Sequence, residues 1–266
     1  MNKESKLGDQ VIVVTGGQGI LGSQVVKTLL KSGATVCSLD VSRSLNAGPG
    51  KVSSSTHHEF HCDVSQKGQV LETIERIESE IGPISGLHNN AATKTSDLTR
   101  FFASVEDYDA DTWAEIMQTN VAGMFFVAQA VGSLMASRGI GSIVQTASIY
   151  GATMGPDQRI YEGSEYLGRQ ISSPVSYTVS KAAVHGLTNH LATYWGSSGV
   201  RVNTVTPGGI RSGQNEEFEA KYSRRVPLGR MAEATEVANT IAFLLSNEAS
   251  YITGQNLFVD GGLSTW

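Results

Sequence analysis

The sequence has few cysteines and few prolines. Its 266 residues include 2 cysteines and 6 prolines, whereas glycine occurs 29 times and hydrophobic residues make up 40%. Two cysteines cannot hold together a disulfide-rich scaffold, and the composition argues against a disordered chain. Because Cys37 and Cys62 lie in strand-like segments, we expect both to be small buried side chains, with a disulfide between neighbouring strands as the open alternative.

Long hydrophobic runs, basic clusters and metal-ligand patterns are also missing. No segment is expected to span a membrane, and residues 1–10 are polar where a secretion signal needs an apolar segment. The net charge of −5 comes without a basic run, which argues against a nucleic-acid partner. His57, His58 and His61 lack a spaced carboxylate or cysteine, so we predict no metal site. We expect a cytoplasmic protein with a small-molecule substrate.

Short apolar segments alternate with segments of helical periodicity along the chain. Continuous apolar runs of strand length indicate strands buried on both faces, and their alternation with helices predicts a parallel sheet with helices on both sides. We therefore predict one α/β domain over residues 1–266, a doubly wound three-layer sandwich with about seven strands in a mostly or fully parallel sheet. The expected strands are 11–15, 34–39, 59–62, 84–89, 141–146, 200–206 and 257–259, and the expected helices are 20–31, 67–80, 112–137, 175–195 and 233–245.

Residues 151–173 break this alternation. The segment holds glycine, proline and charged residues without clear periodicity, and a loop of this length in a compact domain is usually functional or mobile. We expect this insertion to select the substrate. Tyr150, Arg159 and Arg169 are the candidate substrate residues, suited to a hydroxylated or anionic ligand such as a sugar derivative; the alternative is that they are solvated loop side chains.

A glycine-rich turn follows the first expected strand. Glycines at 17, 19 and 22 let the backbone approach a pyrophosphate, and the helix that follows presents its N-terminal amides to the anion. The strand before the turn and the helix after it supply the context that this motif requires. We therefore predict a Rossmann-type nucleotide site that includes Thr15, Gly16, Gly17, Gln18, Gly19, Ile20, Leu21 and Gly22.

Two acidic residues follow the next expected strands. Asp40 can accept hydrogen bonds from the ribose hydroxyls of the adenosine and would repel a 2′-phosphate, which favours NAD over NADP. Two alternatives remain: Asp40 is a turn residue, or Arg43 helps to bind a phosphate. Asp63 would accept from the adenine amino group or cap the helix that begins near Ser65.

Tyr177 and Lys181 are separated by one helical turn, so their side chains share one face. A neighbouring ammonium favours the phenolate and should lower the pKa of Tyr177, which would make this phenol a usable general acid or base. Ser148 lies upstream, at the end of a strand-like run. The spacing of tyrosine and lysine is weak evidence by itself, and its weight comes from the other motifs.

These motifs occur in a fixed order along the chain: the glycine-rich turn at 15–22, Asp63-Val64, Asn89-Asn90-Ala91-Ala92, Asn120, Ser148, Tyr177-x-x-x-Lys181, and Pro207-Gly208 followed by Ser212. In this order the chain resembles the short-chain dehydrogenase/reductase family over essentially its whole length. It is similar to the single-domain members, with an enlarged loop before the active-site tyrosine.

The resemblance implies roles for particular residues. Ser148 would bind the reacting oxygen, Tyr177 would exchange a proton with it, and Lys181 would bind the nicotinamide ribose and stabilise the phenolate. Asn120 would hold a water molecule in a proton relay that starts at the lysine. The cofactor residues implied beyond the turn are Asp40, Asp63, Val64, Asn90, Ala91, Ala92, Tyr177, Lys181, Pro207, Gly208, Ile210 and Ser212.

The chain also departs from the family pattern. The glycine spacing resembles that of the sugar-nucleotide-modifying branch, Ala92 stands where glycine is usual, and Ser212 replaces the usual threonine. The expected reaction is the NAD(P)-dependent interconversion of a secondary alcohol and a ketone, with a sugar or another polar hydroxylated compound as substrate. The alternatives are an NAD-dependent sugar epimerase or dehydratase, and a catalytically silent nucleotide sensor. Apolar helices at 121–135 and 175–195 favour a homotetramer or dimer.

Overall fold

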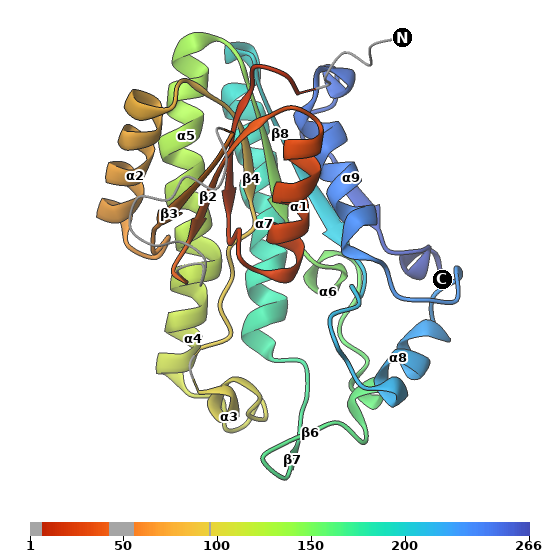
Figure 1. Ribbon diagram of the computed structural model, residues 1–266. Helices are drawn as coiled ribbons and strands as arrows, with labels where there is room; N and C mark the ends of the chain where they lie inside the picture. Colours follow the sequence, from red (N-terminus) through yellow and green to blue (C-terminus); the bar gives the residue numbers. More distant parts are fainter. Residues whose placement is uncertain (1–6, 43–55, 96) are drawn as a thin grey trace.

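A single parallel sheet organises the computed structural model of the protein, which describes residues 7–42, 56–95 and 97–266 (Figure 1). Its seven strands lie in the order β3-β2-β1-β4-β5-β8-β9, and every neighbouring pair is parallel. The predicted doubly wound α/β fold is therefore confirmed. The strands are β1 (Val11–Thr15), β2 (Thr35–Asp40), β3 (His57–His61), β4 (Ile84–Asn89), β5 (Gly141–Thr146), β8 (Val200–Pro207) and β9 (Asn256–Val259).

Helices cover both faces of the sheet (Figure 1). Apolar side chains of α2, α5 and α7 pack on one face, and those of α1 and α9 pack on the other. The helices are α1 (Ile20–Lys31), α2 (Lys67–Glu80), α3 (Leu98–Phe101), α4 (Ala110–Met117), α5 (Met124–Arg138), α6 (Ile149–Ala152), α7 (Val175–Trp195), α8 (Glu216–Ser223) and α9 (Ala234–Leu245).

The buried core explains why the continuous apolar runs form strands. All five residues of β1 are buried, and alternate β1 side chains enter the two clusters on opposite faces of the sheet. Cys37 and Cys62 are buried free thiols on the α2 side of the sheet, as expected. Burial raises the pKa of Cys37 to about 12, so this thiol is held in its unreactive protonated form.

Local structure differs from the expectations in three details. The helix expected over 112–137 is present as a continuous helical stretch, Ala110–Arg138, but a π-helical turn (Gln118–Gly123) lies within it between α4 and α5. The insertion at 151–173 is not a plain loop, because it contains a 3₁₀ turn (Gln158–Tyr161) and a hairpin of β6 (Glu165–Tyr166) and β7 (Arg169–Gln170). Helices α3 and α8 were not anticipated, since both are short and polar apart from a few aromatic residues.

The helical stretch Ala110–Arg138 is long and apolar enough, by length and composition alone, to cross a membrane, and it is the one such stretch in the described part of the chain. The expectation that no segment reaches this length was therefore wrong. Half of its most apolar window is buried, and Val127, Val131 and Met135 belong to the core against the sheet. This stretch serves as a core helix of the α/β sandwich.

Candidate active site

The glycine-rich turn is held in place by backbone contacts that exclude side chains. A Cβ atom at Gly22 would overlap the carbonyl oxygen of Gly16, and one at Gly17 would lie 2.6 Å from Cβ of Ser38. Gly16 itself has φ of +67°, in the left-handed region that favours glycine. The spacing of these glycines therefore reflects the close packing of the turn against α1 and β2.

The first turn of α1 is available to an anion. The helix follows Gly19, which has no side chain to cap it, and the first turn carries no acidic residue. Its backbone N–H groups therefore point out of the turn without a competing carboxylate, as a pyrophosphate site requires. The turn thus fits the phosphates of a dinucleotide, as the sequence predicts.

A cavity of about 620 Å³ lies beside this turn, where β1, β2 and β4 end. Asp40 lines it and accepts hydrogen bonds from the backbone N–H of Gln18, at 3.0 Å, and of Ser42, at 2.9 Å. Arg43, which the sequence offered as an alternative phosphate ligand, lies outside the described residues. Predicted cofactor residues that line the cavity are Gly16, Gln18, Gly19, Asp40, Asp63, Val64, Asn90, Ala91 and Ala92.

The loop after β4 is fixed to β1 by Thr15. Its hydroxyl oxygen accepts hydrogen bonds from the backbone N–H of Asn90, at 2.8 Å, and of Ala91, at 3.0 Å. Asp63 accepts from the N–H of Ser65 at 2.9 Å, a turn contact that precedes α2. The N-cap of α2 is Gln66 and no side chain caps it, so the expected capping by Asp63 is not observed, and its contact with the adenine stays a prediction. Val64 is buried against Gly123 of the π-helical turn.

Lys181 extends from α7 to the end of β5. Its side chain is only 5% exposed, and its ammonium donates a hydrogen bond of 3.0 Å to the carbonyl oxygen of Thr146. Burial lowers the pKa of Lys181 to about 8, because the charged form loses its hydration. A buried amine with a strongly shifted pKa is typical of functional sites.

Tyr177 lies one helical turn before Lys181, and Ser148 caps α6 at the end of β5. Burial raises the pKa of Tyr177, and a hydrogen bond with the hydroxyl of Ser148 opposes that rise. The expectation that Lys181 lowers the pKa of Tyr177 was therefore wrong for this structure. The ammonium is directed at Thr146, and the loss of hydration of the phenolate is the larger effect.

Asn120 lies in the π-helical turn between α4 and α5 and is 2% exposed. Its side-chain oxygen accepts from the N–H of Thr93 at 2.8 Å, and its amide donates to the hydroxyl of Ser180 at 3.3 Å. The π-helical turn, a feature often found at functional sites, thus ties the cofactor-side loop to the helix of Tyr177. Asn120 makes no direct hydrogen bond to Lys181 in the described part of the chain.

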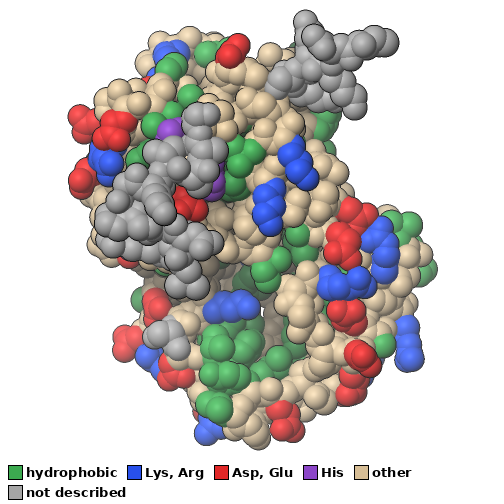
Figure 2. Space-filling view, viewed as in Figure 1, with side chains coloured by type: hydrophobic (Ala, Val, Ile, Leu, Met, Phe, Trp, Pro, Cys, Tyr) green, Lys and Arg blue, Asp and Glu red, His purple; other side chains and the backbone are tan. Residues whose placement is uncertain are grey.

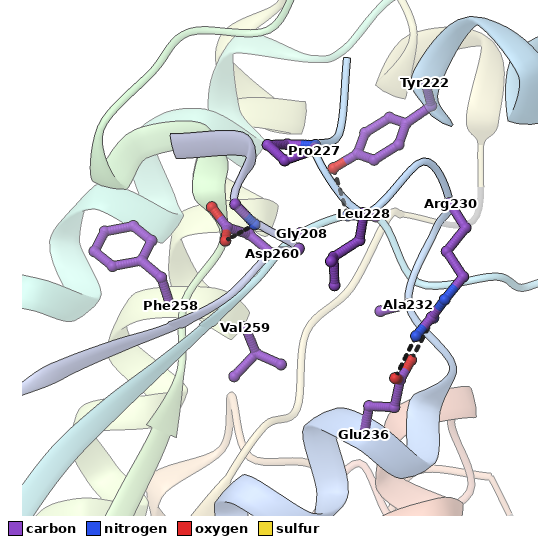
Figure 3. Close-up of a pocket in the computed structure, with 13 residues that line it drawn as sticks. Gly208, Tyr222, Pro227, Leu228, Arg230, Ala232, Glu236, Phe258, Val259 and Asp260 are labelled. Atoms are coloured by element: carbon purple, nitrogen blue, oxygen red, sulfur yellow. Dashed lines mark hydrogen bonds and ion pairs between the residues drawn. The ribbon is translucent and has the colours of Figure 1, made fainter. Parts of the chain in front are cut away.

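The segment after β8 carries the remaining predicted cofactor residues. Pro207 ends β8, the N–H of Gly208 donates to Val259 at 3.0 Å, and the N–H of Ser212 donates to Gln214 at 2.7 Å. Gly208 lines a second cavity, of about 460 Å³, between the ends of β8 and β9 and the start of α9 (Figure 3). Ile210 forms a bridge to Ala232, so this segment is anchored at several points.

Figure 3 shows that the charged side chains of this second cavity already have partners. Arg230 and Glu236 form an ion pair at 2.7 Å, and both oxygens of Asp260 accept backbone N–H groups of the closing turn. The cavity holds none of Ser148, Tyr177 or Lys181. It is therefore separate from the catalytic residues.

The insertion folds back onto α8 beside Tyr177. Tyr161 packs against Phe218 of α8, with ring centroids 5.4 Å apart, and belongs to the same apolar cluster as Tyr150 and Tyr177. Burial raises the pKa of Tyr161 and the charge of Tyr177 adds to the rise, while hydrogen bonds with Ser173 and Tyr150 oppose it. Sequence analysis placed Tyr161 in the insertion but gave no sign of this contact with the catalytic tyrosine.

The two candidate arginines of the insertion have different surroundings. Arg159 forms a two-point ion pair with Asp157, at 2.8 and 2.9 Å, and is 81% exposed. Arg169 lines a third cavity, between the hairpin and α3. Sequence analysis also missed Thr146, whose carbonyl holds Lys181, because a backbone acceptor leaves no residue-specific signal. No cluster of three potential metal ligands occurs in residues 7–42, 56–95 and 97–266, and the absence of a metal site stays a prediction.

Comparison with known proteins identifies the family. A family model described as short chain dehydrogenase matches residues 10–171, and one described as enoyl-(acyl carrier protein) reductase matches residues 164–264. The chain belongs to the short-chain dehydrogenase family, as its motifs predict. A similar curated protein is 2-(S)-hydroxypropyl-CoM dehydrogenase 3 of Xanthobacter autotrophicus, which is 30% identical over 98% of each chain.

Solved structures agree with this assignment. A short chain dehydrogenase from Leptospira borgpetersenii with bound NAD+ matches with a TM-score of 0.86 and 29% identity, over 99% of this chain and 96% of that one. A gluconate 5-dehydrogenase from Burkholderia cenocepacia, in complex with NADP and tartrate, has a TM-score of 0.83 and 26% identity, over 99% and 98% of the two chains. The protein is a nicotinamide-dependent oxidoreductase of alcohols and carbonyl compounds.

Proposed function

We propose that the protein interconverts a secondary alcohol and a ketone in a polyhydroxylated substrate, with NAD as its preferred cofactor. The observation that carries the proposal is the meeting of Ser148, Tyr177 and Lys181 where β5 and α7 adjoin, at the edge of the sheet that also carries the nucleotide-binding turn. A bound nicotinamide would accept or supply the hydride at the reacting carbon.

The chain's own residues would handle the oxygen and its proton. In the oxidative direction the hydroxyl of Ser148 would hold the substrate oxygen, while Tyr177 would remove its proton. Because burial raises the pKa of Tyr177, this step requires the positive charges of Lys181 and of the oxidised nicotinamide to favour the phenolate when cofactor is bound. In reduction the same phenol returns that proton to the developing alkoxide. Lys181, held by Thr146 at 3.0 Å, keeps a positive charge near this exchange, and Asn120 would connect it to a water relay.

Preference for NAD follows from Asp40. Its carboxylate lines the nucleotide cavity where the adenosine ribose of a dinucleotide would lie, and it is held there by Gln18 and Ser42. A fixed negative charge at this point favours free ribose hydroxyls and opposes a 2′-phosphate. The similar structures contain either NAD+ or NADP, so the preference is a property to be tested on this chain.

A polyhydroxylated substrate is supported by two features. Gluconate and tartrate, named with one similar structure, are hydroxy acids. In this chain, the insertion brings Tyr161 next to Tyr177 and places Arg169 at a neighbouring cavity. We further propose that the protein acts as a single cytoplasmic domain and assembles as a dimer or tetramer through helices α5 and α7, where Phe125 and Val179 remain exposed.

The test is a panel of sugars, sugar acids, sugar phosphates and keto compounds, assayed by absorbance of reduced nicotinamide with NAD(H) and NADP(H) in parallel. We expect turnover that forms one NADH for each alcohol oxidised. Catalysis without net NADH would point to the epimerase or dehydratase alternative, and nucleotide binding without any turnover would point to the sensor.

Tyr177→Phe tests the assigned chemistry. Loss of the phenol should reduce kcat at least about a hundredfold, because general acid–base catalysis typically contributes that much, while the Kd for NADH stays within about threefold. Tyr194→Phe is the matched control, since Tyr194 lies on the same helix with 68% of its surface exposed. Normal turnover by Tyr177→Phe would overturn the assignment.

A further inference from the structure

A cavity of about 230 Å³ lies between the insertion and the segment 97–107, and neither the nucleotide site nor the catalytic residues account for it. The hairpin β6–β7 forms one wall, and α3 with the turn after it forms the other. Figure 1 shows both elements beyond the start of α7, at the end of the molecule where the strands of the sheet terminate. The cavity is thus on the catalytic side of the fold.

Both walls are built by specific contacts. Phe102 and Tyr166 both line the cavity and contact each other, with ring centroids 6.3 Å apart, and Phe102 also packs edge-on against the buried Phe101. Asp97 caps α3 by accepting from two backbone N–H groups, and the N–H of Ile171 donates to Ser164 at 3.0 Å to close the hairpin. In Figure 2, hydrophobic side chains gather over α3, next to a hollow in the surface.

The two charged residues that line this cavity, Arg169 and Asp107, do not form an ion pair with each other. Arg169 is exposed, lines the cavity, and has no side-chain hydrogen bond or ion pair within the described ranges. Asp107, the other charged lining residue, accepts a hydrogen bond from the hydroxyl of Ser104 at 3.0 Å. Arg100, in the same region, is paired with Asp109, and Arg159 is paired with Asp157. Arg169 is therefore the cation of this group that is available to a ligand.

From these observations we infer that the cavity is a substrate subsite, in which Arg169 binds an anionic group and the rings of Phe102 and Tyr166 hold the adjoining carbon chain. Carboxylate and phosphate share the chemistry that recognises a guanidinium, and aromatic faces suit the C–H surface of a sugar or an acyl chain. The substrate class is thus a hydroxylated compound with a carboxylate or phosphate distant from the reacting carbon. This inference rests on the proposed function.

The subsite and the catalytic tyrosine share one framework. Gln158 binds Ser173 through two hydrogen bonds, at 3.0 and 3.3 Å, which fixes the end of the insertion just before α7 begins. From the other wall, the hydroxyl of Tyr108 bonds to that of Ser176, the residue before Tyr177. A ligand held in the cavity is therefore positioned relative to Tyr177 by elements that both pack against the start of α7.

The experiment compares three related ligands: D-glucitol, D-gluconate and D-glucitol 6-phosphate. Each is measured by calorimetry for its Kd on the enzyme saturated with NADH, and by kcat/KM with NAD. The variants are Arg169→Gln and, as a matched control, Arg224→Gln, an exposed arginine that follows α8 and lines none of the cavities described above. Both arginines are exposed, so neither change should affect folding, which a thermal unfolding curve would verify.

Arg169→Gln should weaken binding of at least one anionic ligand by about tenfold to a hundredfold and change glucitol less than about twofold. Arg224→Gln should change all three less than about twofold. Added salt should weaken the wild-type anion affinity and have little effect on Arg169→Gln. If Arg169→Gln weakens binding of gluconate, the anionic group is a carboxylate; if it weakens binding of D-glucitol 6-phosphate, the group is a phosphate.

Two results would overturn the subsite: equal weakening of charged and neutral ligands by Arg169→Gln, or no preference of the wild type for either anion over glucitol. Anion binding that depends on Arg169 without oxidation of any ligand would keep the subsite and reject the proposed reaction. Oxidation of neutral polyols without any preference for anionic ligands would keep the proposed reaction and reject the subsite.

Discussion

The nucleotide-binding turn and the insertion are fixed in place by different kinds of contact. At the turn, backbone meets backbone: Gly22 lies against the carbonyl of Gly16, and Gly16 donates its N–H to Leu39 at 2.8 Å. The insertion is held by side chains that reach it from distant segments, such as the amide of Asn215 on Ser164 and the ammonium of Lys221 on the carbonyl of Glu162. Backbone packing at the turn tolerates few substitutions. The side-chain contacts that hold the insertion can be replaced by others, so the insertion can change in sequence and with it the substrate.

Gly22→Ala should have the largest effect, because it tests the rigidity of the turn directly. The added methyl group would overlap backbone atoms that cannot move without opening the turn. We expect a loss of about 3 kcal/mol in the free energy of unfolding and at least about tenfold weaker NADH binding. Urea unfolding and fluorescence titration of NADH would measure both. Unchanged affinity would show that the turn is looser than its contacts indicate.

The same difference explains how much could be predicted from the sequence. Strands β1, β4 and β5 and helices α1, α2 and α7 begin and end where their apolar patterns predict, because those patterns are local and the sheet buries them. The glycine spacing predicted the position of the turn, because a Cβ atom at Gly17 or Gly22 would clash with atoms of residues nearby in the fold.

The parts that sequence analysis missed depend on distant contacts. The π-helical turn within the helix expected over 112–137 occurs where Gly123 contacts Val64 and Asn120 contacts Thr93, and neither contact can be read from the apolar periodicity of the sequence. The hairpin in the insertion has strands of two residues, too short for an alternating pattern to be seen. The direction of the pKa shift of Tyr177 was missed because it depends on burial, which the sequence does not give, and because the ammonium of Lys181 is bonded to Thr146.

Lys181→Met tests the buried charge on α7, the helix that follows the insertion. The pKa of Lys181 is about 8 in the folded protein against an ordinary 10.5, so the folded state binds this proton less tightly than the unfolded state. The buried charge therefore costs stability below about pH 8, and the cost disappears as the pH rises from 8 to 10.5. Lys181→Met should raise the free energy of unfolding by about 2 kcal/mol at pH 7 and abolish turnover.

Urea unfolding across this pH range would measure the effect. The gain in stability should shrink steadily with rising pH, and at high pH the variant should be no more stable than the wild type, since the carbonyl of Thr146 loses its donor. A gain that does not depend on pH would mean that the methionine simply packs better.

Asp40→Asn should alter cofactor preference without disturbing the turn. Removing the charge reduces the repulsion of a 2′-phosphate, so the ratio of kcat/KM for NAD to that for NADP should fall about tenfold. Asp63→Asn is the matched control, because Asp63 lines the same cavity but is predicted to contact the adenine, which both cofactors contain. It should weaken both equally. A ratio unchanged by Asp40→Asn would leave Asp40 as a turn residue only.

Gly163→Ala is the counterpart of Gly22→Ala within the insertion. Gly163 has φ of +84°, and a Cβ there would lie 2.7 Å from the carboxylate of Glu217, the end of a flexible exposed side chain. The cost should be about 1 kcal/mol, chiefly from the left-handed backbone, with no change in NADH affinity. A loss as large as that of Gly22→Ala would contradict the contrast between the two regions.

Tyr150→Phe should have the smallest effect on stability, and its sign is informative. The side chain of Tyr150 is 7% exposed, and its buried hydroxyl interacts with the hydroxyl of Tyr161 but makes no well-aligned hydrogen bond among the described residues. Removing a buried hydroxyl whose one contact is poorly aligned costs little, so the melting temperature should stay nearly the same. Tyr222 is equally buried, at 4%, but its hydroxyl accepts the N–H of Gly209. Tyr222→Phe should therefore destabilise by about 1 kcal/mol.

The activity of Tyr150→Phe then tests whether the hydroxyl of Tyr150 binds the substrate. Tyr150 belongs to the same cluster as Tyr161 and Tyr177, and the sequence places it among the candidate substrate residues. If its hydroxyl receives an oxygen of the substrate, Tyr150→Phe should lower kcat/KM several-fold while the unfolding curve is unchanged. Equal activity and higher stability would make the hydroxyl dispensable and remove Tyr150 from the substrate site. A buried hydroxyl without a well-formed hydrogen bond lowers the stability of the free protein, whereas a bound substrate can supply the missing partner. The two measurements, stability and activity, show whether the substrate does so.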